Sequence, residues 1–190
     1  MKRKAFDVLA SATGAVLVVV LVVAGALLMW GYSFANSNVH NQLAQQEIVF
    51  PPAAAFAAAK PGTEITPGMR PYLLQYAGEP LTTGAQAEAY ADHFIAVHLS
   101  EMPYGGVYSK VSAASRANPK SAQLAALVQT SFQGTTLRGL LLEAYGFSEF
   151  ALIAFWAGIA AFALGLIMAF LVGLGFWHSR RVTESDELLA

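Results

Sequence analysis

The sequence predicts an all-α membrane protein in which two transmembrane helices flank a small helical extracytoplasmic module. Three observations support this fold class. Of the 190 residues, 56% are hydrophobic and only 12% are charged, about half the charge of a typical soluble domain. Two long segments contain no Asp, Glu, Lys or Arg, as expected of membrane-spanning helices. Between them, no segment shows the sustained alternation of apolar and polar residues that is typical of strands.

Residues 1–8 are predicted to form a short cytoplasmic N-terminus, and residues 9–32 the first transmembrane helix. These 24 residues are almost wholly apolar and rise about 36 Å as a helix, which is enough to cross a hydrocarbon core of about 30 Å. Trp30 and Tyr32 mark one membrane interface as part of an aromatic belt. A cleaved secretory signal is the alternative, but the apolar core of a signal is only about 7 to 15 residues long.

Residues 150–177 are predicted to form the second transmembrane helix, with Trp156 and Trp177 near its interfaces. Small residues recur in it at intervals of four, and we expect them to form one smooth helix-packing stripe: Ala157, Ala161, Gly165, Ala169 and Gly173. Small residues let the backbones of membrane helices approach closely. Either the first span of the same chain or a helix of another protein is expected to fill this groove.

The orientation follows from basic residues beside the two spans, because Lys and Arg are retained on the cytoplasmic side. Lys2, Arg3 and Lys4 precede the first span, and Arg180 and Arg181 begin the tail that follows the second, residues 178–190. Both termini are therefore predicted to be cytoplasmic. Residues 33–149 then form an extracytoplasmic module, in a multi-pass protein of the cell (cytoplasmic) membrane.

The first half of the module contains few clear helix signals. The alanine-rich segment after Pro51 and Pro52 fits either an extended chain or a short helix, and turn signatures predict a loop up to Arg70. A short helical turn is expected from Pro71. The clearest helix begins at Thr83, whose hydroxyl can cap the helix while Gln86 reaches back in a capping box. Its apolar residues recur at helical spacing as far as Met102.

The second half of the module is predicted to contain two more helices. A loop containing Tyr108 leads to Asn118 and Pro119, a typical helix cap followed by proline at the first helical position. An amphipathic helix is expected to follow. Gln133 and Gly134 are expected to separate it from a further helix over residues 136–145.

Histidine is the only metal-ligand type that needs to be considered in the module. His93 and His98 are five residues apart, so on a helix they point about 140° from one another. His98 and Glu101 could share an ion, but a metal site needs a third ligand whose position the sequence does not fix. Since His98 also lies on the apolar face, we interpret it as structural. Glu88 and Asp92 share a polar helix face, and exposure of this face to solvent accounts for both carboxylates without a catalytic role. We expect no enzyme activity and no cofactor.

The composition limits the partners as well. A net charge of −1 argues against nucleic acid as a partner, because nucleic-acid binding needs a strongly basic surface. The absence of cysteine excludes disulfides, thiolate metal sites and a cysteine nucleophile. The expected partners are membrane lipid and other membrane proteins or further copies of the chain.

Four segments of the module are distinctive, namely residues 76–78, 83–99, 105–109 and 135–145. They resemble segments of a family of uncharacterised actinobacterial two-span membrane proteins. The resemblance implies the same topology and an envelope location. Some relatives carry an aromatic ring-opening dioxygenase label, but a non-haem iron site needs two histidines and a carboxylate around one open site. The helical spacing of His93 and His98 argues against that activity.

These observations predict a non-enzymatic accessory or scaffolding subunit of a membrane-embedded envelope complex. Transport is disfavoured, because two spans without charged residues do not line a pathway unless they oligomerise. The alternative is an extracytoplasmic ligand-binding module anchored by the two spans, with its pocket near Phe94 and Tyr108. A metal-dependent enzyme is the third interpretation.

Overall fold

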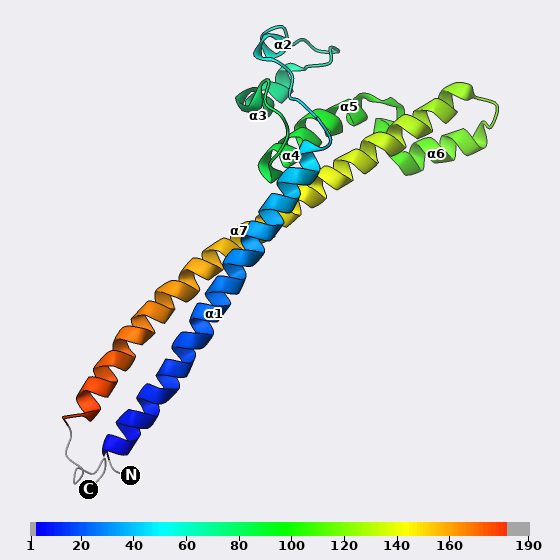
Figure 1. Ribbon diagram of the computed structural model, residues 1–190. Coiled ribbons are helices and arrows are strands. Elements are labelled where there is room, and N and C mark those ends of the chain that lie inside the picture. The colour runs from blue at the N-terminus through cyan, green and yellow to red at the C-terminus, as the bar shows by residue number, and fades with distance from the viewer. Residues whose placement is uncertain (1–2, 182–190) are drawn as a thin grey trace. The chain divides into compact units, whose positions relative to one another are not determined.

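The computed structural model describes residues 3–181, and their regular structure is helical (Figure 1). The two long helices are α1 (Arg3–Ala44) and α7 (Ala122–Ser179). Between them lie α2 (Ala53–Ala57), η1 (Pro67–Met69), α3 (Arg70–Leu73), η2 (Leu74–Tyr76), α4 (Gly84–Tyr90), η3 (Ala91–Ile95), α5 (Ala96–Glu101), η4 (Pro103–Gly106) and α6 (Tyr108–Ala117). The predicted all-α fold class is confirmed for these residues, in which β pairing is limited to one isolated bridge between Val49 and Pro80.

The chain divides into two compact units, Met1–Phe34 with Ala151–Ala190 and Ala35–Phe150. We call the described part of the first unit the helix pair and the second unit the module. Both long helices contain segments long and apolar enough to cross a membrane, and only 11% and 6% of those segments are buried. The many exposed large apolar side chains of these helices support a membrane location, because soluble proteins bury such helices in a core. The span limits 9–32 and 150–177 stay predictions.

The two helices of the pair run antiparallel (Figure 1) and meet along a seam. Its α1 positions are Asp7, Ser11, Gly14, Val18, Leu21, Gly25, Leu28 and Tyr32, all buried or half-buried. Its α7 positions are Ala151, Phe155, Gly158, Ala161, Gly165, Met168, Val172, Gly175 and Ser179. Successive seam positions are three or four residues apart, mostly in alternation. This spacing gives a seven-residue repeat, which is typical of a left-handed coiled coil.

Glycine residues allow a close approach of the two helices of the pair. A Cβ atom added to Gly158 would lie 3.1 Å from the sulfur of Met29 and 3.3 Å from the carbonyl oxygen of Gly25. A Cβ atom at Gly25 would lie 3.0 Å from the ring of Phe162. Lipid supplies no hydrophobic force between helices, so this close backbone contact is a main source of attraction.

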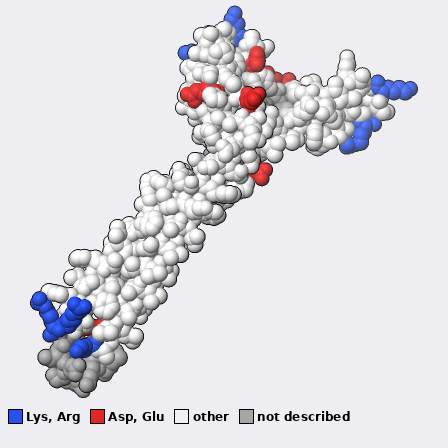
Figure 2. Space-filling model, in the orientation of Figure 1, with Lys and Arg blue, Asp and Glu red and all other residues white. Residues whose placement is uncertain are grey.

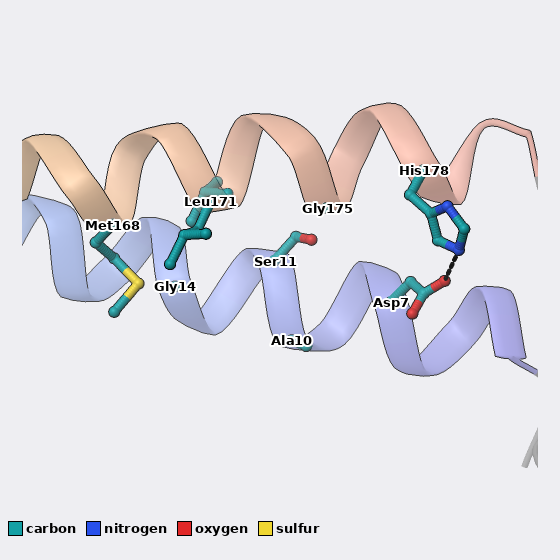
Figure 3. A pocket seen from close by; sticks show the side chains of 9 residues that line it. Asp7, Ala10, Ser11, Gly14, Met168, Leu171, Gly175 and His178 are labelled. Carbon is teal, nitrogen blue, oxygen red and sulfur yellow. Dashed lines mark ion pairs between the residues drawn. The ribbon is translucent and has the colours of Figure 1, made fainter.

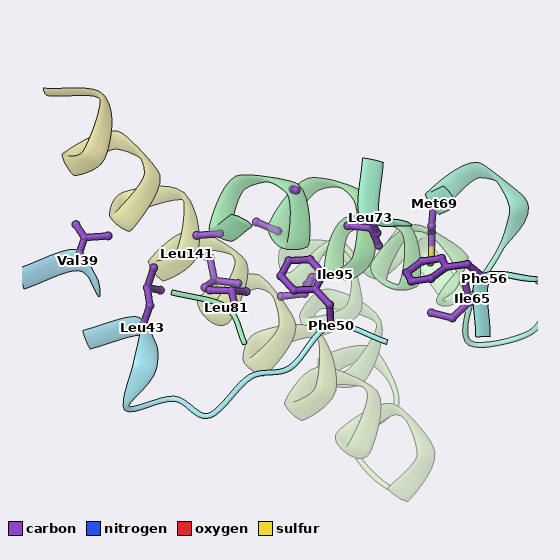
Figure 4. Close-up of a cluster of buried hydrophobic side chains, with 13 residues drawn as sticks. Val39, Leu43, Phe50, Phe56, Ile65, Met69, Leu73, Leu81, Ile95 and Leu141 are labelled. Carbon is purple, nitrogen blue, oxygen red and sulfur yellow. The ribbon is translucent and has the colours of Figure 1, made fainter. Parts of the chain in front are cut away.

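The module is built around a hydrophobic core (Figure 4). Its most deeply buried large side chains are Phe50, Phe56, Met69, Leu73, Leu81 and Leu141. The chain after α1 crosses this core as an extended segment, in which the N–H of Phe50 donates to the carbonyl of Glu79 at 2.9 Å. The alanine-rich segment after Pro52 forms the short helix α2 and not an extended chain.

The predicted capping box at Thr83 is confirmed. The Thr83 hydroxyl accepts from the N–H of Gln86 at 3.2 Å, and the side-chain oxygen of Gln86 accepts from the N–H of Thr83 at 3.0 Å. Helix continues from Gly84 to Glu101 but includes a π-helical turn, η3. The π-turn redirects the apolar face halfway along the helix, since one residue is inserted in the usual spacing.

The second half of the module differs from the prediction at three points. Tyr108 begins the helix α6 and does not lie in a loop. Asn118 ends α6 instead of beginning the next helix, and Ser121 caps α7 by accepting from the N–H of Leu124. Gly134 does not interrupt α7, because its missing side chain makes room for Leu99, whose Cδ2 would lie 2.8 Å from an added Cβ.

Replacing Gly158 by leucine should separate the helix pair, because the added side chain meets backbone atoms of α1. Interhelical attraction at such sites is worth about 1 to 2 kcal/mol in model peptides. The matched control is Gly173→Leu, since an added Cβ at Gly173 meets no described atom within 4 Å. Thermal unfolding in detergent should show a lower transition for Gly158→Leu only. Equal effects of the two substitutions would contradict the seam.

Candidate functional site

The predicted stripe of small residues on α7 divides between two faces of the helix. Ala161 and Gly165 lie in the seam, whereas Ala157, Ala169 and Gly173 are exposed. The expectation of one smooth stripe is wrong, because four residues advance a helix by about 400°, or 40° beyond a full turn. Over the sixteen residues from Ala157 to Gly173 this drift reaches about 160°. The seam follows the seven-residue repeat instead.

The predicted interface aromatics lie at the two ends of the helix pair. Tyr32 contacts Phe155 with ring centroids 5.0 Å apart, and Trp30 and Trp156 are exposed beside them. Trp177 lies at the opposite end, where the guanidinium of Arg181 is 4.0 Å from its ring centroid. Trp156 and Trp177 are 21 positions apart on one helix, about 32 Å, which matches the thickness of a hydrocarbon core.

The topology-setting residues that the structure describes lie near the ends of the long helices. Arg3 and Lys4 are in the first turn of α1, and Arg180 and Arg181 follow α7 directly. Figure 2 shows Lys and Arg gathered at one end of the helix pair. Lys2 lies outside the described residues. The cytoplasmic location of this end stays a prediction.

A polar pair lies between the helices at this same end (Figure 3). Nε2 of His178 is 3.9 Å from Oδ2 of Asp7. That oxygen is buried and has no hydrogen-bond partner among the described residues. Ser11 and glycine residues on both helices leave an open pocket of about 220 Å³ beside it. Asp7 therefore depends on His178 for part of its electrostatic compensation, since an unpaired buried carboxylate is costly.

Sequence reasoning did not single out this pair. His178 directly follows the predicted second span, and Asp7 belongs to the predicted N-terminal segment. The signal that could have found the pair is the seven-residue repeat, on which Asp7, Ser11 and Gly14 occupy successive seam positions. Among residues 3–181, no group of three or more His, Asp or Glu side chains could hold a metal ion.

The two module histidines have separate contacts. Nδ1 of His98 donates to the carbonyl oxygen of Phe94 at 2.7 Å, and its ring tilts against the Phe94 ring. His93 instead stacks on Tyr72, with ring centroids 3.5 Å apart and an interplanar angle of 3°. The carbonyl acceptor places the proton of a neutral His98 ring on Nδ1. These contacts support the structural interpretation of His98.

Asp92 is ion-paired, contrary to the expectation that solvent accounts for it. Its Oδ1 accepts from Nε and Nη2 of Arg138 at 3.2 and 2.6 Å. The pair joins η3 to α7, so the carboxylate has a packing role. Nearby, burial raises the pKa of the Tyr90 hydroxyl, and the negative charge of Glu64 raises that pKa further.

Phe94 and Tyr108 do not share a pocket wall as predicted. Phe94 lines an open groove of about 260 Å³ together with His98, Met102 and Gly134. The ring of Tyr108 lies against Phe132, with centroids 5.8 Å apart. The groove is smaller than the roughly 300 to 1,000 Å³ of typical small-molecule sites.

No family model, curated protein or solved structure matches the chain. Membership of the actinobacterial two-span family therefore stays a prediction.

We expect the Asp7 and His178 side chains to stabilise the helix pair jointly. The coupling should be about 0.2 to 1 kcal/mol, because His178 is half-exposed and solvent screens it. A double-mutant cycle with Asp7→Asn and His178→Gln, followed by thermal unfolding in detergent, measures this value. The coupling should shrink as salt is added. Strictly additive effects of the two substitutions would show that the pair contributes nothing.

Proposed function

We propose that the protein is a non-enzymatic accessory or scaffolding subunit of an envelope complex in the cytoplasmic membrane. In this proposal the helix pair anchors the chain, both termini are cytoplasmic, and the module projects to the outside, where it binds another membrane protein of the complex. Two features support the proposal: the apolar seam of the helix pair and an exposed aromatic surface on the module.

The seam favours an anchor over a transport pathway. Between Asp7 and Tyr32, the only polar side chain at the α1 seam positions is that of Ser11. The α7 seam positions from Ala151 to Gly175 are all apolar. An ion or polar solute crossing a membrane needs a series of polar groups along its route. The two helices use their facing surfaces for contact with one another.

The observation that carries the proposal is the aromatic surface of a helical arm. The arm comprises residues 104–134: α6 packs back along the first turns of α7, and a short turn joins them (Figure 1). Four large side chains at its base are between 43% and 51% exposed: Tyr104, Val107, Tyr108 and Phe132. Aromatic residues are enriched in protein interfaces and dominate their binding energy.

The base of the arm is held in place by a buried joint. The hydroxyl of Ser131, which is fully buried, donates to the carbonyl oxygen of Gly106 at 2.6 Å. Gly106 has a positive φ of 63°, and a Cβ atom there would collide with the backbone of Leu99. The joint presents the aromatic side chains on a preformed surface. A preformed surface loses little conformational entropy when a partner binds.

Ligand binding by the module is the second candidate function. The groove beside His98 favours it, since it combines an apolar lining with three polar side chains, His98, Thr130 and Gln133. Its small, open shape supports this function less well than the aromatic surface supports scaffolding.

The proposed orientation predicts the labelling of single cysteines, for which the natural chain provides a cysteine-free background. A cysteine at the exposed position Ala58 should react with an impermeant thiol reagent in intact cells. A cysteine at Ser185 should react only after the membrane is opened. Both patterns follow from retention of the terminal basic residues in the cytoplasm. The reverse pattern would place the module in the cytoplasm.

Removal of the aromatic surface should release the partner. Tyr108→Ser combined with Phe132→Ser should weaken capture of the partner at least about 30-fold, because truncating a hot-spot residue costs about 2 kcal/mol or more. The measurement is chemical cross-linking in native membranes, mild detergent extraction and quantitative mass spectrometry. Tyr72→Ser is the control, since Tyr72 is similarly exposed but lies on α3.

Two outcomes would contradict the scaffolding function. One is that the double variant accumulates normally and retains the partners of the natural chain. The other is that the natural chain itself captures no membrane protein above a control anchored by an unrelated helix pair.

A further inference from the structure

Charge is distributed unevenly in the module. From Met102 to Leu142 the sequence contains no Asp or Glu, although it contains Lys110, Arg116, Lys120 and Arg138. Arg138 pairs with Asp92, so the other three basic residues determine the charge of the arm. Figure 2 shows Lys and Arg side chains on the arm, with the acidic side chains on other parts of the module. The arm is therefore a cationic surface in a chain with a net charge of −1.

We call residues 110–121 the end of the arm, and the three cations are spread along this segment. Lys110 and Arg116 lie on α6, and Lys120 lies in the turn between α6 and α7. All three side chains are exposed. Nη1 of Arg116 donates to the hydroxyl of Ser112 at 2.6 Å, which holds the guanidinium along the helix surface. The turn itself is hollowed, with an open pocket of about 380 Å³ lined by residues 117–121.

This spacing suits an extended anion better than a small one. Lys110 and Arg116 are six residues apart, so on a helix they are about 9 Å apart along the axis and turned by about 240°. Lys120 lies beyond the end of that helix. Side chains that diverge in this way cannot converge on a single phosphate. They can contact successive charges along a polymer that wraps the end of the arm.

We propose that the end of the arm binds an anionic polysaccharide of the envelope that carries a phosphate or carboxylate group on each repeat. The proposal uses the external location of the module and adds a second partner to the one that binds the aromatic surface. The protein then links a membrane complex to the surrounding polymer. Residues 122–149 of α7 rise about 42 Å within the module, so the end of the arm lies far along α7 from the predicted start of the second span.

Binding should be electrostatic and therefore sensitive to salt. Exposed charges are screened over about 10 Å at 0.1 M salt. Each cation that contacts the polymer releases a counterion from it, so removal of one contact should reduce the slope of log affinity against log salt by about one.

The test compares two variants of equal charge in the full-length protein, reconstituted in nanodiscs of zwitterionic lipid. Lys110→Gln with Lys120→Gln removes two cations from the arm. Lys60→Gln with Arg70→Gln removes two exposed cations from elsewhere in the module. Polyphosphate and polygalacturonate serve as the polymer probes. The arm variant should bind about tenfold more weakly at 0.1 M salt, and the control variant should bind within twofold of the natural chain.

Several outcomes would overturn the proposal. Equal losses in the two variants would mean that net charge alone attracts the polymer. Equally tight binding of pyrophosphate would indicate a small-anion site. Arm-dependent binding of vesicles that contain phosphatidylglycerol, without polymer binding, would identify a lipid surface instead. The variant with serine at Tyr108 and Phe132 should bind polymer normally, so failure of this proposal is distinguishable from failure of the scaffolding function. Circular dichroism checks that each variant is folded.

Discussion

The structure of the helix pair depends on direct backbone contact between α1 and α7 at Gly25 and Gly158. In lipid the attraction must come from dispersion at short range, which only small residues permit over a helix surface. The contact also sets the register of the pair. Sliding one helix by a single heptad, about 10 Å, would separate Asp7 from His178 and Tyr32 from Phe155 at the same time. The contact between Gly25 and Gly158 therefore determines that Asp7 lies beside His178 and that Tyr32 lies beside Phe155.

Packing in the module explains why α7 continues through residues that commonly end helices. Glycine in a helix interior costs about 1 kcal/mol relative to alanine, and α7 contains Gly134, Gly139 and Gly146 before the predicted span. At Gly134 the cost is offset, because Leu99 packs in the space that a side chain would fill. Ser131, Arg138 and Leu141 hold the same stretch to the rest of the module. At Gly139 and Gly146 nothing in the structure explains the choice of glycine.

The features that the sequence predicts correctly are local ones. The capping box at Thr83 depends on two residues three positions apart, and the apolar long helices depend on composition alone. The missed features join distant positions: Asp92 with Arg138, 46 residues apart, and Asp7 with His178. Asn118 and Pro119 illustrate the same limit, since a cap followed by proline fits a helix start, but here the pair closes α6. For the small residues of α7, the predicted spacing of four residues is wrong. Residues spaced by four turn away from the seam, which repeats every seven residues, after at most two such intervals.

Division of the module into a buried core and an arm separates stability from binding. The core residues around Phe50 and Leu73 are buried, so their substitution would unfold the module and reveal little about partners. The arm has few buried side chains, and its position depends on the joint between Ser131 and Gly106 and on the contact of Leu99 with Gly134. Aromatic and cationic side chains can therefore change on its surface at little cost to folding. A surface that tolerates substitution while its backbone stays in place is one on which binding specificity can be built without loss of the fold.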